Sequence, residues 1–222
     1  MKRHGLDMTG GRIWPVLLAF TVPLLLENLL QLLYNTVDSI VVGRYVGISA
    51  LAGVSATTHI CGMLVRFFNG TAVGAGVVIS RNFGAKDKEK LYLSIQTTML
   101  LTFAACVILT VTGISCSGWL LKKISTPPDV FEEADLYLKI YFGGISGLLI
   151  YNMGGAVLRA MGDSRRPLYF LIFCSILNII LDLIFVVYFH WGIAGAAAAT
   201  VIAQMISAFL VLYVLAFSTK AL

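Results

Sequence analysis

Charged side chains are scarce in this chain of 222 residues. Only 12% of the residues are charged and 59% are hydrophobic, whereas soluble domains carry roughly a quarter charged residues. Apolar stretches of about 20 or more residues recur along the sequence, and that is the length an α-helix needs to cross a bilayer. The composition excludes a soluble globular domain and predicts an all-α integral membrane protein.

The sequence also lacks the marks of several function classes. No HExxH or GxSxG pattern occurs, so we expect no enzyme. The four cysteines, Cys61, Cys106, Cys116 and Cys174, fall in apolar stretches without a CxxC pair. Buried thiols are therefore favoured over a metal site or a disulfide. The chain has a net charge of +5. Its basic residues are scattered among the loops rather than gathered in one patch, so we expect no nucleic acid partner.

Apolar runs and turn signals divide the chain into six predicted spans. At 1.5 Å rise per residue, each is long enough to cross about 30 Å of hydrocarbon. The spans cover approximately residues 14–42, 49–79, 91–121, 134–158, 167–189 and 193–217. We expect a single six-helix bundle in the lipid bilayer.

The basic residues predict the orientation of this bundle. Most of the sixteen lie in the segments before the first span, after the second, after the fourth and after the sixth. The N-terminal ones are Lys2, Arg3 and Arg12. By the positive-inside rule, both termini are cytoplasmic and the protein is multi-pass in the cytoplasmic (inner) membrane of the cell.

Small residues at helix-packing spacing mark possible contacts between spans. They occur as Gly70-xxx-Gly74, as Gly143-xxx-Gly147 and as the alanine-rich run 194–199. Small residues let helix backbones approach closely in lipid, so we expect close helix contacts at these positions.

The first span carries polar residues at steps of four, four and three: Glu27, Gln31, Asn35 and Asp38. This spacing draws one polar stripe along an apolar helix. Lipid cannot satisfy such groups, so the stripe should face the bundle interior or a water-filled cavity. A purely structural polar seam between helices is the alternative.

The fifth and sixth spans carry a second set of polar residues. Asp182 follows Asn178 by four residues and shares its helical face, and Thr200 lies in the sixth span. Counted from the outer ends of their spans, Asp38 lies roughly 7 Å deep, and Asp182 and Thr200 roughly 12 Å deep. An ionisable group at such depth normally marks an ion path, a proton relay or a substrate contact.

If these residues converge, their oxygens suit a hard monovalent cation. Carboxylate, amide carbonyl and hydroxyl oxygens can bind Na⁺, and two carboxylates in a low-dielectric site can share a proton. The same cluster could then bind Na⁺ or H⁺ competitively. Two separately hydrogen-bonded acids that only hold helices together are the alternative.

Pro23, within the first span, is predicted to be either a hinge or a static bend.

Taken together, the sequence resembles the N-terminal half of a MATE (multidrug and toxic compound extrusion) transporter. The matching segments appear in the family's order along nearly the whole chain. They are Pro23–Gly43, Gly74–Lys86, Leu158–Pro167, Asn178–Asp182 and Gly192–Thr200. The resemblance is to the DinF-like, prokaryotic branch, because Asp182 stands on the fifth span.

This resemblance implies one lobe of a twelve-helix antiporter that exports cationic, amphipathic drugs in exchange for Na⁺ or H⁺. It implies a cation site made of Asp38, Asn178, Asp182 and Thr200, and no cofactor or other metal. Gln31, Asn35 and Asn152 fall where the family's substrate cavity lies.

The family has roughly twice this length. We therefore expect a partial product that lacks its C-terminal lobe, with a half-size protein that pairs with a second copy as the alternative. Two other functions remain open: a lipid-linked oligosaccharide flippase of the same superfamily, which would need basic residues such as Arg66 in its cavity, and a non-transporting membrane scaffold or half-subunit.

Overall fold

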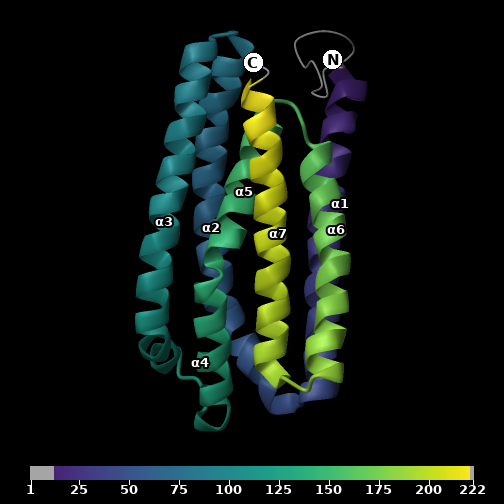
Figure 1. Cartoon of the computed structure of the whole chain (residues 1–222), viewed down its shortest axis with the longest axis vertical. Helices are drawn as coiled ribbons and strands as arrows, with labels where there is room; N and C mark the ends of the chain where they lie inside the picture. Colours follow the sequence, from purple (N-terminus) through teal and green to yellow (C-terminus); the bar gives the residue numbers. More distant parts are fainter. Residues whose placement is uncertain (1–12, 221–222) are drawn as a thin grey trace.

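The protein, seen here in a computed structural model that describes residues 13–220, is a bundle of helices lying roughly along one axis (Figure 1). Lys2, Arg3 and Arg12, which contribute to the predicted orientation, lie outside the described residues. In chain order the elements are α1 Ile13–Val41, the π-helical turn η1 Val42–Val46, α2 Ile48–Gly84, α3 Lys88–Lys123, α4 Pro128–Gly143, α5 Ile145–Ala160, α6 Arg165–Asp182, the π-helical turn η2 Leu183–Tyr188 and α7 Gly192–Lys220.

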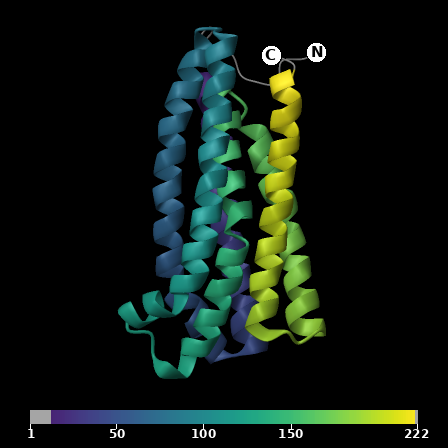
Figure 2. The same cartoon turned by 60° about the vertical axis from the view of Figure 1, so that its left-hand side comes forward.

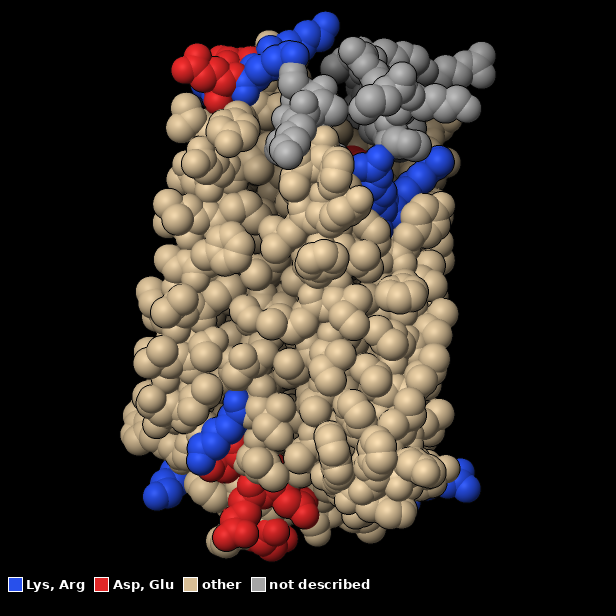
Figure 3. Space-filling model, in the orientation of Figure 1, with Lys and Arg blue, Asp and Glu red and all other residues tan. Residues whose placement is uncertain are grey.

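The chain crosses the bundle back and forth. α1 begins and α7 ends at the same end of the bundle, where α2 also turns into α3 and α5 leads into α6 (Figures 1 and 2). Within residues 13–220, five helices are long and apolar enough to cross a membrane, and α4 with α5 makes a sixth span if the bent pair is one crossing. Figure 3 shows charged side chains at the two ends of this face, with an uncharged band between them.

The expected fourth span is divided by a sharp bend. α4 and α5 meet at Gly144 and differ in direction by 50°. A Cβ atom at Gly144 would collide with the side chain of Val201, and one at Gly147 would lie 2.8 Å from the backbone of Gln204. Both glycines are therefore needed for α5 to approach α7 this closely.

The other small-residue patterns have different outcomes. Ala196, Ala197 and Ala199 are buried in the bundle, as expected for the alanine-rich run. Gly70 and Gly74, in contrast, have open space where a Cβ would be added. The expectation of a close helix contact at Gly70-xxx-Gly74 within this lobe is therefore wrong.

The first helix is attached to the rest of the bundle more loosely than the others. α1 packs mainly against α6. Among its side chains from residue 14 onward, only Pro23, Asp38 and Val41 are buried. Leucines such as Leu25 and Leu32 are more than 60% exposed on its outer side. The position of α1 therefore depends on a small number of inward-facing groups.

Candidate functional site

Four buried polar residues from three helices form what we call the acidic cluster: Asp38, Asn178, Asp182 and Thr200. Asp38 comes from α1, Asn178 and Asp182 from α6, and Thr200 from α7. Their residual exposures are 8% for Asp38, 1% for Asn178, 0% for Asp182 and 4% for Thr200. The four residues singled out as a cation site thus lie together inside the bundle.

The amide of Asn178 ties this cluster together. In its favoured orientation, Nδ2 donates to Asp182 Oδ2 at 3.2 Å and the amide oxygen accepts from the Thr200 backbone N–H at 3.2 Å. The opposite orientation would point the amide oxygen at the Asp182 carboxylate, which cannot donate when ionised. Asn178 therefore bridges α6 and α7 and fixes the position of Asp182.

The carboxyls of Asp38 and Asp182 lie close enough to interact electrostatically. A proton held between them would let one carboxyl donate to the other. Each also has a buried oxygen, Oδ1, without a hydrogen-bond partner in the described part of the chain. Buried polar atoms are normally satisfied, because an unpaired one loses its hydration without compensation. The cluster therefore has unused capacity to accept a proton or coordinate a cation.

Two tyrosines complete the cluster and were missed by the sequence reasoning. Tyr34 interacts electrostatically with both carboxyls and with the side chain of Thr200. Tyr137 of α4 is buried and interacts with Asp38. A signal for Tyr34 was available, because it precedes Asp38 by four residues and so shares its helical face.

Both acids lie just before a change of helix type. Asp182 is the last residue of α6, directly before η2, and Asp38 lies one turn before η1. The two π-helical turns also contact each other. π-Turns inside helices occur often at functional sites, because they redirect the helix and release backbone groups from the regular pattern. Nothing in the sequence analysis predicted them.

The predicted substrate-cavity residues do not share one environment. Gln31 and Asn152 are half-buried, whereas Asn35 is exposed on the surface of α1. The backbone carbonyl of Asn35 accepts from the Ser39 hydroxyl at 2.9 Å. The polar stripe of α1 is also divided, since Glu27 pairs with Arg159 of α5 rather than with the acidic cluster.

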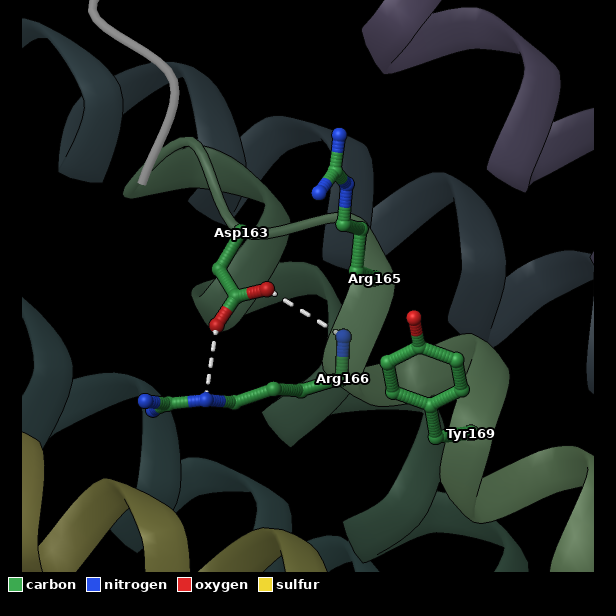
Figure 4. Close-up of a pocket in the computed structure, with 4 residues that line it drawn as sticks. All are labelled: Asp163, Arg165, Arg166 and Tyr169. Atoms are coloured by element: carbon green, nitrogen blue, oxygen red, sulfur yellow. Dashed lines mark hydrogen bonds and ion pairs between the residues drawn. The ribbon is translucent and has the colours of Figure 1, made fainter. Parts of the chain in front are cut away.

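A pocket of about 360 Å³ lies elsewhere, at the start of α6, lined by Asp163, Arg165, Arg166 and Tyr169. Asp163 binds Arg166 twice, through the backbone N–H and through Nε, each at 3.2 Å. Figure 4 shows the guanidinium groups of Arg165 and Arg166 pointing in different directions. Asp163 thus binds the first turn of α6, and the two guanidinium groups do not converge on a common anion.

The comparisons with known proteins agree with this architecture. The MatE family profile matches residues 23–184. The probable multidrug resistance protein YpnP of Bacillus subtilis (strain 168) is 33% identical over 201 residues, which are 90% of this chain and 45% of that protein. The chain thus spans about half the length of this curated relative.

Two solved structures of a multidrug resistance MATE family transporter of the MOP superfamily also match. The outward-facing conformation has a TM-score of 0.86 at 26% identity and covers 94% of this chain and 46% of that one. The inward-facing conformation has a TM-score of 0.78 at 29% identity, covering 83% and 42%. The fold is therefore that of one lobe of these transporters. The chain belongs to the MatE family, the family of multidrug and toxic compound extrusion transporters.

Proposed function

We propose that this chain is the N-terminal lobe of an antiporter that exports cationic, amphipathic compounds in exchange for Na⁺ or H⁺. The observation that carries the proposal is the contact between Asp38 and Asp182, two buried carboxyls that each keep an unpartnered oxygen. The relative described as a probable multidrug resistance protein supports small-molecule export as the task.

The acidic cluster has the donors that ion exchange needs. Without Na⁺, Asp38 and Asp182 share a proton. When Na⁺ enters, it displaces that proton and takes carboxylate oxygens, with the Asn178 amide oxygen or the Thr200 hydroxyl as further ligands; hard cations prefer such oxygens. The cluster thus carries a proton or a sodium ion, but not both.

Binding of a proton or Na⁺ to the acidic cluster would affect transport by changing the position of α1. Asp38 is the acid that α1 contributes to the cluster, whereas Asn178, Asp182 and Thr200 come from α6 and α7. A cation held between these helices favours the arrangement in which α1 lies close to α6, and release favours another. Alternating access follows when the two arrangements open to opposite sides of the membrane.

The membrane and a second lobe complete the proposed transporter. The lobe lies in the cytoplasmic membrane with both termini cytoplasmic, and a C-terminal lobe, or a second copy of this chain, completes the substrate path. Asn35, exposed on α1, would then line the cavity between the lobes with Gln31 and Asn152. A lipid-linked oligosaccharide flippase is less favoured, because Arg66, the basic residue singled out for its cavity, is exposed on the surface of α2.

The test uses this lobe joined to its second lobe in cells that lack other efflux pumps. Asp182→Asn should abolish export of ethidium, because the amide cannot carry a proton or balance a cation. The matched control is Asp129→Asn, which changes an exposed acid at the start of α4 and should leave export intact. Unchanged ethidium export in the Asp182→Asn protein would contradict the proposed function.

A further inference from the structure

A second polar cluster joins α1 to α5. Arg159 Nη1 donates to both carboxylate oxygens of Glu27, at 3.0 and 3.2 Å. The Tyr151 hydroxyl lies 3.2 Å from Glu27 Oε1 and 3.1 Å from the carbonyl oxygen of Pro167 at the start of α6. The side chains of Arg159 and Glu27 are only 25% and 13% exposed. We name Glu27, Tyr151 and Arg159 the inner clasp.

The inner clasp and the acidic cluster lie on the same face of α1. Glu27 and Asp38 are eleven residues apart, which is about 16 Å along the helix axis and three turns with an offset of about 20°. The two clusters therefore fix α1 at two points along one line. Fixing two points of a rod sets its tilt and rotation, which a single contact leaves free.

The rest of α1 offers little to replace either attachment. Its packing is mainly against α6, and Pro23, one turn before Glu27, removes the backbone hydrogen bond to the Ala19 carbonyl. The helix can bend at that place with less loss than elsewhere. Glu27 lies just beyond the bend, so its pairing with Arg159 decides whether the middle of α1 stays against α5.

We propose that the inner clasp positions α1 for ion binding, so that Glu27, Tyr151 and Arg159 set the apparent cation affinity of the acidic cluster without touching the cation. This inference rests on the proposed function. A site assembled in only a fraction of molecules shows an affinity reduced by that fraction. Opening the clasp lets Asp38 move away from Asp182, so more cation is needed to bring it back.

The position of α1 can be measured directly in the 222-residue chain in lipid nanodiscs. The four free cysteines are replaced and one cysteine is introduced by Ala19→Cys, at a half-buried position of α1. The rate of its reaction with a maleimide dye reports how often this face of α1 is uncovered. Glu27→Gln should raise the rate about fivefold or more, the lower range of ordinary coupling between sites.

Three further variants test the pairing. Combining Glu27→Arg with Arg159→Glu should bring the rate back towards that of the parent protein, because the ion pair is restored in reverse. Tyr151→Phe should raise the rate less than Glu27→Gln, because it keeps the ion pair. Asn28→Ala changes an exposed neighbour whose side chain donates to the Leu24 carbonyl, and should have no effect. A Glu27→Gln rate equal to that of the parent overturns the clasp.

A second readout separates positioning from mere stabilisation. The labelling rate is measured against Na⁺ concentration, and against pH without Na⁺, together with the melting temperature. If the clasp positions α1, the Na⁺ or proton concentration at which the labelling rate has changed by half should be higher in Glu27→Gln. The expected increase is about fivefold or more. If Glu27→Gln lowers the melting temperature but leaves this ion concentration unchanged, the clasp stabilises the protein without positioning α1. A parent protein that responds to neither ion contradicts the proposed function, whereas the labelling rates still decide whether the clasp exists.

Discussion

Asp38 of α1 and Asp182 of α6 interact where these two helices pack together, and each lies just ahead of a π-helical turn. The contact needs α1 against α6, and the turns η1 and η2, which touch each other, come directly after it. The two acids therefore lie next to the end of the bundle that these turns form.

Asn178→Ala should destabilise the lobe by about 1–3 kcal/mol, because Asp182 Oδ2 and the Thr200 N–H lose the partner they share. The free energy of unfolding in detergent measures this effect. Asn28→Ala, on the exposed side of α1, is the matched control and should change it by less than about 0.5 kcal/mol. Equal effects of the two substitutions would show that Asn178 has no bridging role.

Tyr34→Phe should keep the fold and weaken ion binding. The substitution removes only the hydroxyl that interacts with Thr200 and with both carboxyls. Loss of one hydrogen bond of about 1 kcal/mol corresponds to a several-fold weaker apparent affinity. The measurement is the ion concentration at half-maximal thermal stabilisation, with Tyr45→Phe as the control at an exposed tyrosine. If this ion concentration is the same in both variants, Tyr34 does not contribute to ion binding.

Gly147→Ala should destabilise the bundle by about 1–3 kcal/mol, because its Cβ would lie 2.8 Å from the Gln204 backbone and push α5 from α7. Gly74→Ala meets open space and should be neutral or stabilising by up to about 1 kcal/mol, since alanine favours helix. Melting temperatures of the two variants check the difference. A tolerated Gly147→Ala would contradict the close approach of α5 and α7.

The start of α3 should loosen at acid pH. The Lys90 backbone N–H donates to Asp87 Oδ1 at 3.1 Å, and the Lys90 ammonium lies 3.0 Å from Oδ2. These hydrogen bonds hold the pKa of the Asp87 carboxyl below its ordinary value. Because the folded pKa is the lower one, the cap is fully present above about pH 4, the unfolded value, and is lost as the pH falls through the folded one.

Hydrogen exchange of the Lys90 amide measures this loss. Protection should be constant from neutral pH down to about pH 4 and should fall below it, after correction for intrinsic exchange. Asp87→Ala should remove the protection at every pH. A decline that begins near neutral pH would show that another group, and not Asp87, controls the end of the helix.

Several features of the fold followed from local pattern. The polar residues Asp38, Asn178, Asp182 and Thr200 could be selected because lipid cannot satisfy them, and the structure places them together. What spacing could not give is the partner of each group. Glu27 belongs to the same stripe as Asp38, yet it pairs with Arg159, because the helix opposite it supplies a cation at that height.

Other features depend on contacts between distant segments. Gly70-xxx-Gly74 and Gly143-xxx-Gly147 are the same pattern, but only Gly147 of these meets a neighbouring backbone within 3 Å. Gly144, where the bend lies, packs against Val201 of α7, and Asn35 lies on a side of α1 that this lobe leaves exposed. Sequence spacing describes one helix, whereas these outcomes depend on which helix lies beside it.

The central claim is that Asp38 and Asp182 form one ion site, and a double-mutant cycle tests it most directly. The melting temperature of the purified chain is measured against Na⁺ and against pH for the parent, Asp38→Asn, Asp182→Asn and the double variant. Each single substitution should abolish the ion-dependent shift, and the double variant should lose no more, because residues in contact are not additive. An ion-dependent shift that survives in both single variants would contradict the account.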